Sequence, residues 1–169
     1  ARQIEYGSEK GVPWGVSESA YNARDLQLNY QYGPFGIPGL GLKRGLGDDL
    51  VVSPYSSALA AMVEPRAALE NFRRLAQEGA LAQFGFYESI DYTHERRQPD
   101  QKSALIKAYM IHHQGMILIS LDNVLNDNAM QRRFHSEPLV QASELLLQER
   151  IPRGVPLAQP RSEEVRSDG

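Results

Sequence analysis

The sequence predicts an all-α fold in which helices form two concentric layers beside a long ordered loop at residues 7–52. Residues 65–79 carry apolar side chains at helical spacing on one face only, whereas residues 103–125 are apolar on nearly every side. The first pattern is typical of a half-exposed helix and the second of a buried one. Residues 7–52 show no sustained period, which predicts the loop.

Composition limits the classes of protein to consider. The chain has 169 residues, 41% of them hydrophobic, which is enough for one domain with its own core. A formal net charge of −3 without a basic stripe argues against nucleic acid as the main partner. No window approaches the ~20 apolar residues of a membrane span. The chain has no cysteine, which excludes disulfides and thiolate chemistry.

The first residues of the chain predict the C-terminal turns of a helix. Residues 1–6 read like the last turns of a helix, without an initiator Met or a clean cap, so we interpret the chain as a piece of a longer protein. Residues 33–41 then place turns in the loop, and its many aromatic and aliphatic residues argue against disorder. We expect this loop to line a cavity, with short strand pairs.

Helix signals dominate after residue 52. Ser53-Pro54 predicts the start of a helix over residues 55–62, Pro65 opens a second helix and Gly79 ends it. The third helix is expected over residues 103–125, the fourth over 129–135 and the fifth over 138–149. Five helices are too few to close a two-layer barrel, which again indicates a fragment. We expect the domain to cover residues 1–151, and the prolines beyond Ile151 predict a linker or tail at 152–169.

Two acidic clusters are candidates for catalysis on sugars, because each sets carboxylates among aromatic rings and glycines. Glu18 follows Trp14-Gly15, a setting that suits a general acid. The alternative is an ordinary carboxylate in the first turn of a helix over residues 20–26, capped by Ser17. In the second cluster, Glu88 and Asp91 alternate with Phe86, Tyr87 and Tyr92. The alternative there is a half-buried strand whose outward residues happen to be acidic.

His112-His113 raises the question of a metal site. Adjacent residues on a helix point about 100° apart, so the two imidazoles cannot hold one ion from one face. We therefore expect neither a metal nor a cofactor. Burying His112, His113 and Gln114 within the predicted helix costs several kcal/mol unless polar partners meet them, such as loop groups or sugar hydroxyls.

Four ordered motifs identify a resemblance: residues 13–21 (PWGVSESAY), 36–46 (GIPGLGLKRGL), 85–88 (GFYE) and 108–116 (AYMIHHQGM). They resemble the glucoamylase-like domain of bacterial cyclic β-1,2-glucan synthases, and residues 130–150 resemble that domain's downstream edge. The resemblance covers nearly the whole chain up to Pro152. It implies the C-terminal part of an (α/α)6 barrel of the glucoamylase-like type.

The resemblance also implies a function and partners. The parent would be a bacterial inner-membrane protein with a glycosyltransferase region before this soluble, cytoplasmic domain and a phosphorylase-like region after it. The domain would close linear β-1,2-glucan chains into rings by transglycosylation, whereas related domains hydrolyse the same polymer. A glycan-binding or scaffolding module without chemistry is the alternative from another class.

The matching acids are Glu18 and Glu88, in an order that the sequence leaves open. A retaining pair would stand roughly 5–5.5 Å apart and an inverting pair roughly 6.5–9.5 Å apart, and ring closure favours retention. The motif positions expected to line the sugar cleft are Trp14, Tyr21, Tyr87, Asp91, Tyr92, His112, His113 and Gln114.

Overall fold

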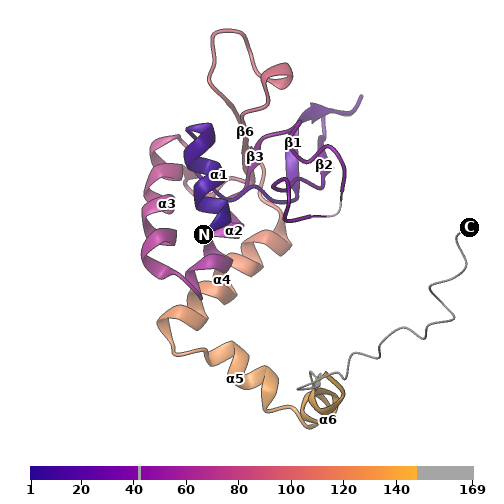
Figure 1. The fold of residues 1–169 in the computed structure, drawn as a ribbon, viewed down its shortest axis with the longest axis vertical. Coiled ribbons are helices and arrows are strands. Elements are labelled where there is room, and N and C mark those ends of the chain that lie inside the picture. The colour runs from indigo at the N-terminus through magenta and orange to yellow at the C-terminus, as the bar shows by residue number, and fades with distance from the viewer. Residues whose placement is uncertain (42, 148–169) are drawn as a thin grey trace, which may run out of the picture. The chain divides into compact units, whose positions relative to one another are not determined.

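The computed structural model describes residues 1–41 and 43–147 (Figure 1). Its contacts divide the chain into two units, with the boundary between Gln131 and Arg132. The helices are α1 (Arg2–Lys10), α2 (Pro54–Ala61), α3 (Pro65–Gln77), a 3₁₀ turn (His94–Arg96), α4 (Ile111–Leu125), α5 (Ala129–His135) and α6 (Pro138–Leu147). The strands are β1 (Ser19–Arg24), β2 (Tyr30–Gly33), β3 (Val51–Val52), β4 (Leu81–Ala82), β5 (Gly85–Phe86), β6 (Ser89–Asp91) and β7 (Ala104–Ile106).

The strands correct the all-α prediction. They form three small antiparallel sheets: the β1-β2 hairpin, the β4-β5 hairpin, and a three-stranded sheet in the order β3-β6-β7. The short strand pairs expected within residues 7–52 are confirmed, but Ser17 opens no helical turn because residues 19–24 form β1 instead. Carboxylates and aromatic rings are therefore carried by strands and their connections as well as by helices.

The helix predicted over residues 103–125 is wrong in its first part. Residues 104–106 form β7, and α4 begins only at Ile111. The cause is tertiary: β6 is buried along its whole length, and β7 supplies the partner that its backbone needs, with Ile90 opposite Leu105. Nor is α4 buried on all sides in this chain, since Ile111, Leu118 and Leu125 are largely exposed.

The remaining helices follow the sequence signals closely. Pro54 and Pro65 stand at the first positions of α2 and α3. Gly79, just beyond α3, adopts a φ of 87°, which favours glycine. As expected, α3 is half exposed, with Ala68 and Asn71 among its buried residues. The described part of the fifth predicted helix is α6, and the expected tail at residues 152–169 lies outside the described residues.

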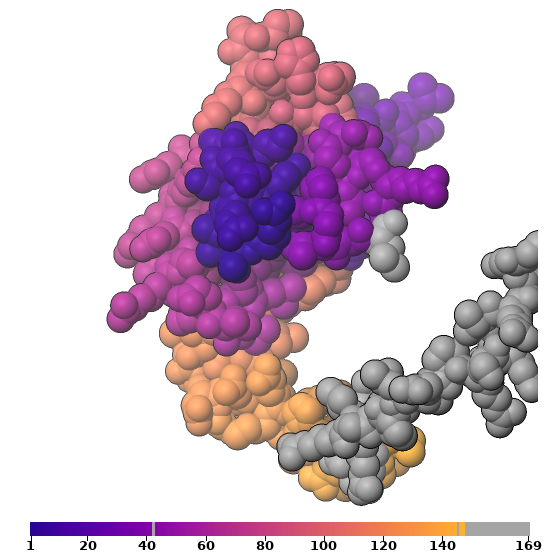
Figure 2. Space-filling model, viewed as in Figure 1, coloured from indigo at the N-terminus to yellow at the C-terminus, as the bar shows by residue number. Residues whose placement is uncertain are grey.

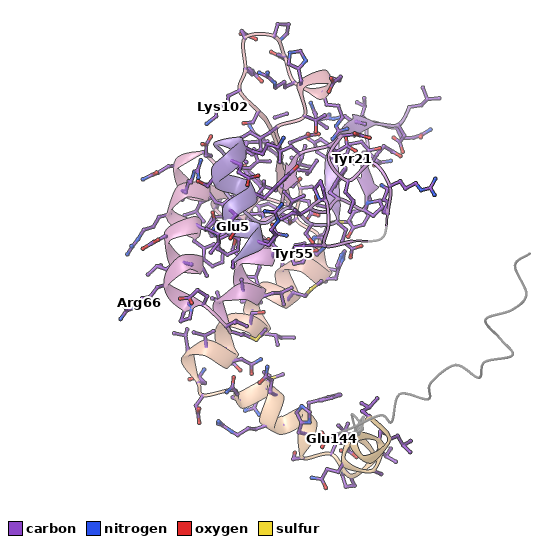
Figure 3. All side chains as sticks on the ribbon, in the orientation of Figure 1. Glu5, Tyr21, Tyr55, Arg66, Lys102 and Glu144 are labelled. Atoms are coloured by element: carbon purple, nitrogen blue, oxygen red, sulfur yellow. The ribbon has the colours of Figure 1, made fainter. Side chains whose placement is uncertain are left out.

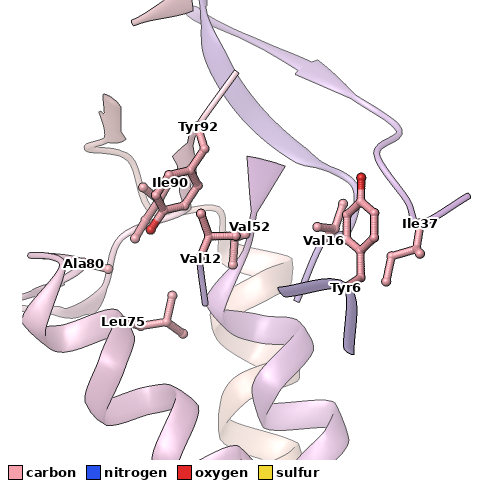
Figure 4. Close-up of a cluster of buried hydrophobic side chains, with 9 residues drawn as sticks. All are labelled: Tyr6, Val12, Val16, Ile37, Val52, Leu75, Ala80, Ile90 and Tyr92. Carbon is pink, nitrogen blue, oxygen red and sulfur yellow. The ribbon is translucent and has the colours of Figure 1, made fainter. Parts of the chain in front are cut away.

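The hydrophobic core of the first unit joins α1, α3 and the three-stranded sheet (Figure 4). Its buried members are Tyr6, Val12, Val16, Ile37, Val52, Leu75, Ala80, Ile90 and Tyr92. Close approach of α1 depends on Gly7, because a Cβ there would lie 2.9 Å from Trp14 Cα. Figure 2 shows α1 in indigo between the magenta surface of α3 and the purple loop after β2. The core therefore anchors the segment that leads to Glu18.

The described part of the second unit is helical. α6 is tied back to the end of α5, because His135 Nδ1 contacts the Glu144 carboxylate and Gln141 Nε2 donates to the His135 carbonyl over 3.1 Å. Neither here nor in the other described residues is a helix long and apolar enough to cross a bilayer.

Candidate functional site

Glu88 stands between β5 and β6 and is held from several directions. Its carboxylate Oε1 accepts a hydrogen bond from the Ala20 N–H over 3.2 Å and lies 2.8 Å from His113 Nδ1, while Oε2 lies 3.0 Å from the same nitrogen. The Glu88 N–H donates to the Ala108 carbonyl, and Ser53 Oγ donates to the Glu88 carbonyl. The side chain has no exposed surface, so its position is set by these neighbours.

His113 connects Glu88 to two tyrosines. It lies in the first turn of α4, buried to 1% exposure, and its ring stacks on Tyr55 of α2 at 3.9 Å between centroids and 11° between planes. Its Nε2 lies 3.4 Å from the Tyr32 hydroxyl of β2. Because Nδ1 faces an acceptor-only carboxylate when Glu88 is ionised, the neutral imidazole then carries its proton on Nδ1 and accepts at Nε2. The polar partner expected for a buried histidine is therefore Glu88.

Glu18 approaches the same two tyrosines from the exposed turn before β1. The pKa of Tyr32 is raised to about 12, first by burial and then by its interactions with Glu18, Tyr55 and Glu88. Burial also raises the pKa of Tyr55, which the Ser17 hydroxyl opposes and both glutamates reinforce. The two carboxylates, far apart in the chain, thus both raise the pKa of the same two phenols.

Asp91 is placed differently from the sequence expectation. Its Oδ2 accepts from Arg96 Nε over 2.7 Å and from the Asn22 N–H over 3.0 Å, and its Oδ1 accepts from the Thr93 N–H over 3.0 Å. Arg96 also pairs with Asp49. Since the Asp91 side chain has no exposed surface and its oxygens have partners, it is not placed to line a sugar cleft.

Tyr21 belongs to the Asp91 surroundings. The Arg96 guanidinium lies 4.8 Å from the centre of the Tyr21 ring, and the Phe35 ring meets it edge-on at 5.4 Å. Figure 3 labels Tyr21 near the β1-β2 hairpin and Tyr55 on α2. Of these two tyrosines, the sequence singled out Tyr21, whereas Tyr55 makes the contacts with the Glu88–His113 pair.

Tyr92 and Trp14 also lie elsewhere. Tyr92 is a member of the hydrophobic core, where burial raises the pKa of its phenol, so the expectation that it lines a cleft is corrected. The Trp14 backbone bonds to the Asn71 side chain, and Trp14 lines a hollow of about 720 Å³ among α1, α2 and α3. The Trp14 side chain, from the motif that contains Glu18, therefore lies beside the helices of the first unit.

The last three predicted residues border the Glu88–His113 pair. His112 is exposed, with its ring 4.0 Å from that of His113 and 6.3 Å from that of Tyr32. Gln114 Nε2 donates to the Phe86 carbonyl over 3.1 Å. Tyr87 is half-buried, and its ring lies 5.3 Å from that of Tyr109. Their contact with sugars stays a prediction. Within the described ranges, no group of three or more His, Cys, Asp or Glu is placed to hold a metal ion.

Sequence reasoning missed Tyr32 and Tyr55. The sequence marks Tyr55 only as part of a helix start, and Tyr32 only as one of many aromatic residues in a long loop. The pairing of Ala20 with Tyr32 across the β1-β2 hairpin brings Tyr32 beside the backbone that holds Glu88. Only a predicted hairpin register could have revealed it.

Comparison with known proteins places this chain in a family. The Glycoamylase family model, described as "Putative glucoamylase", matches residues 3–138. The cyclic beta-(1,2)-glucan synthase NdvB of Rhizobium meliloti (strain 1021) is 46% identical over 155 residues, which is 92% of this chain and 6% of that protein. This chain is thus a small part of that relative's length.

Two solved structures share the fold. One, from Bacteroides caccae ATCC 43185 and described as a "putative glucoamylase", matches with a TM-score of 0.54 and 24% identity over 86% of this chain and 31% of its own. The other is the endo-beta-1,2-glucanase from Chitinophaga pinensis in complex with sophorotriose and glucose, with a TM-score of 0.53 and 21% identity over the same shares. Likeness at this identity shows the fold alone. Together with the family model and the synthase relative, it supports one conclusion: this chain belongs to the Glycoamylase family.

Proposed function

We propose that this chain forms part of a carbohydrate-active catalytic centre that acts on β-1,2-linked glucan, with Glu18 and Glu88 as its catalytic pair. The substrate class follows from the 46% identity to a cyclic beta-(1,2)-glucan synthase. The observation that carries the pairing is that the segment bearing Glu18 contacts Glu88, because the Ala20 N–H donates to Glu88 Oε1 over 3.2 Å. In agreement with this, both carboxylates raise the pKa of Tyr32 and of Tyr55. Two acids that share neighbours in this way can act on the same glycosidic bond.

The surroundings of the two acids favour different roles. Glu88 is fixed by donors on its carboxylate and is kept from bulk water, which suits a nucleophile that must be held in one position. Glu18 is exposed and raises the pKa of Tyr32, which suits a group that exchanges a proton with leaving and entering hydroxyls. Because the Glu88 side chain is fully covered, a covering side chain moves aside when sugar binds.

The proposed reaction retains the anomeric configuration. Glu88 forms a bond to the anomeric carbon while the glycosidic C–O bond breaks, and Glu18 gives its proton to the leaving oxygen. A hydroxyl at the other end of the same chain then attacks the anomeric carbon, returns its proton to Glu18 and releases Glu88. One bond is broken and an equivalent one is formed, so the chain closes into a ring. If water attacks instead, the same centre hydrolyses the polymer, the activity named for the Chitinophaga pinensis neighbour.

The proposal extends to the setting of the centre. By analogy with the synthase relative, this chain acts beside glycosyltransferase and phosphorylase-like domains, and on the cytoplasmic side of the inner membrane. Linear β-1,2-glucan made by the first of these domains is the expected substrate.

The test is incubation of the full-length protein with linear β-1,2-glucan, followed by mass analysis for cyclic and shortened products. Glu88→Gln is expected to lower turnover by about 10³-fold or more, and Glu18→Gln by about 10²–10⁴-fold. Both variants should still bind the glucan, because the change keeps side-chain size. Glu70→Gln, on the exposed face of α3, is the matched control and should keep wild-type turnover.

Two outcomes discriminate against the proposal. Wild-type turnover in both glutamine variants would refute the catalytic pair. Binding of the glucan without any product from the wild-type protein would favour a glycan-binding module instead.

A further inference from the structure

Side-chain contacts run from Glu88 to Tyr32, beside Glu18. Glu88 contacts His113 Nδ1, at 2.8 Å from Oε1, and His113 Nε2 lies 3.4 Å from the Tyr32 hydroxyl. The segment that carries Glu18 reaches the same group, because the Ala20 N–H donates to Glu88 Oε1 over 3.2 Å and Glu18 raises the pKa of Tyr32. The 3.4 Å contact is long, as hydrogen bonds in unliganded sites often are before substrate tightens them.

The Tyr32 hydroxyl has one proton and two possible acceptors, the Glu18 carboxylate and His113 Nε2. It cannot donate to both at once. Which acceptor receives the proton must therefore depend on whether Glu18 is ionised.

We propose that Tyr32 is a positioning residue that couples the two acids, by donating its hydroxyl proton to His113 while Glu18 is protonated and to Glu18 once Glu18 is ionised. The proposal rests on the proposed function. In the first state His113 keeps its Nδ1 proton directed at Glu88 and holds the nucleophile. In the second, Tyr32 stabilises the negative charge left on Glu18 after it has protonated the leaving oxygen. Only hydrogen bonds are exchanged, and no proton leaves Tyr32.

His113 is better suited to this role than to binding sugar. It is 1% exposed, its ring is stacked on Tyr55, and both ring nitrogens face protein groups. The titratable groups that face Tyr32 come from each element around it: Glu18 before β1, Tyr55 of α2, Glu88 before β6, and His112 and His113 of α4.

Tyr32→Phe is the first test, because it removes the hydroxyl and keeps the ring. In the full-length protein we expect kcat on linear β-1,2-glucan to fall about tenfold or more, with KM unchanged within about twofold. The basic limb of kcat/KM against pH should move to higher pH, since ionised Glu18 loses a donor. Tyr30→Phe, on the same strand with its hydroxyl bonded to Arg24, is the matched control and should change neither.

A second test uses non-additivity. If Tyr32 and His113 act as one unit, the Tyr32→Phe/His113→Gln double variant should be no more than about twofold slower than the slower single variant. If the two losses multiply instead, the residues act independently and the coupling is refuted.

A third measurement needs no turnover. The ¹⁵N shifts of the His113 imidazole should report a proton on Nδ1 and none on Nε2 in the wild-type protein at neutral pH. Glu18→Gln should change the Nε2 shift, and it should no longer do so when Tyr32 is Phe. An Nε2-protonated ring, or a response to Glu18→Gln that survives Tyr32→Phe, would overturn the proposal.

The two proposals fail separately. Loss of turnover in the glutamate variants with an unaffected Tyr32→Phe protein would remove the coupling and leave the catalytic pair. Wild-type turnover in the glutamate variants would remove the catalytic pair whatever the imidazole shifts report.

Discussion

Glu88 directly precedes the short strand β6 and Asp91 is its last residue, and both carboxylates are fully buried. Asp91 is paired with Arg96, a permanently charged partner, and also accepts two backbone N–H groups. Glu88 is paired with His113, whose charge depends on its protonation, and accepts one backbone N–H group. The same burial thus gives a fixed ion pair at one end of the strand and a titratable pair at the other.

The difference separates a structural acid from a candidate catalytic one. The Asp91–Arg96 pair ties β6 to β1 through the Asn22 N–H, and its guanidinium also meets Asp49 in the loop before β3. The Glu88–His113 pair adjoins Tyr32 and an exposed acid, Glu18. Burial alone therefore does not distinguish the two acids, whereas the chemistry of the partner does.

The largest effect on stability is expected at the Asp91 end. Asp91→Asn removes one charge of a buried ion pair and should lower the free energy of unfolding by about 3 kcal/mol. Asp49→Asn, which removes the more exposed partner of the same arginine, should cost less. Urea unfolding of the two variants measures this order. A loss at Asp91 no greater than at Asp49 would contradict a structural role for the Asp91 pair.

An intermediate effect on stability is expected near Glu88, when the Tyr32 hydroxyl loses its proton at high pH. The pKa of Tyr32 is raised to about 12 by burial and by Glu18. The raised pKa means that the stability from neutral Tyr32 is fully present below pH 10 and is lost as the pH rises from 10 to 12.

The ionisation of Tyr32 is measured by ultraviolet absorbance of tyrosinate against pH. Subtracting the titration curve of a protein that carries Tyr32→Phe leaves the contribution of this phenol. Glu18→Gln should lower the pKa of Tyr32 toward 10, and Glu70→Gln should leave it unchanged. An unchanged titration in the Glu18 variant would place Glu18 away from Tyr32.

The smallest effect is expected at an exposed ion pair. Lys102, labelled in Figure 3, lies 3.2 Å from Glu78, but its side chain is 64% exposed. Lys102→Met should change the free energy of unfolding by no more than about 0.5 kcal/mol, because solvent screens the pair. The same urea unfolding measures it. A loss as large as that of Asp91→Asn would show that burial is not what distinguishes the two pairs.

Local signals in the sequence predicted the helices well and the strands poorly. Pro54 and Pro65 mark the starts of α2 and α3, and Gly79 marks the end of α3. These residues act on the conformation of the backbone turn in which they lie. Residues 104–106 were read as helix because their apolar pattern suits either structure. Their strand state depends on β6, a segment that is distant in the sequence.

The candidate site was predicted in part for the same reason. Glu18, Glu88 and the two histidines were visible as polar residues in aromatic, glycine-rich or apolar surroundings. The sequence also suggested that Asp91 and Tyr92 lie in a cleft, whereas Arg96 and the hydrophobic core hold them. Tyr32 and Tyr55 could not be selected, because nothing in their own segments distinguishes them from other tyrosines.

The sequence by itself determined the family and the starts of α2 and α3, and it selected the candidate acids, because these depend on residue type and on neighbours along the chain. Only the tertiary structure decided which acid is paired with an arginine and which with a histidine, and which tyrosines contact that histidine. Those outcomes depend on strand pairing and on the packing of α2 against α4, which bring together residues that are distant in the sequence.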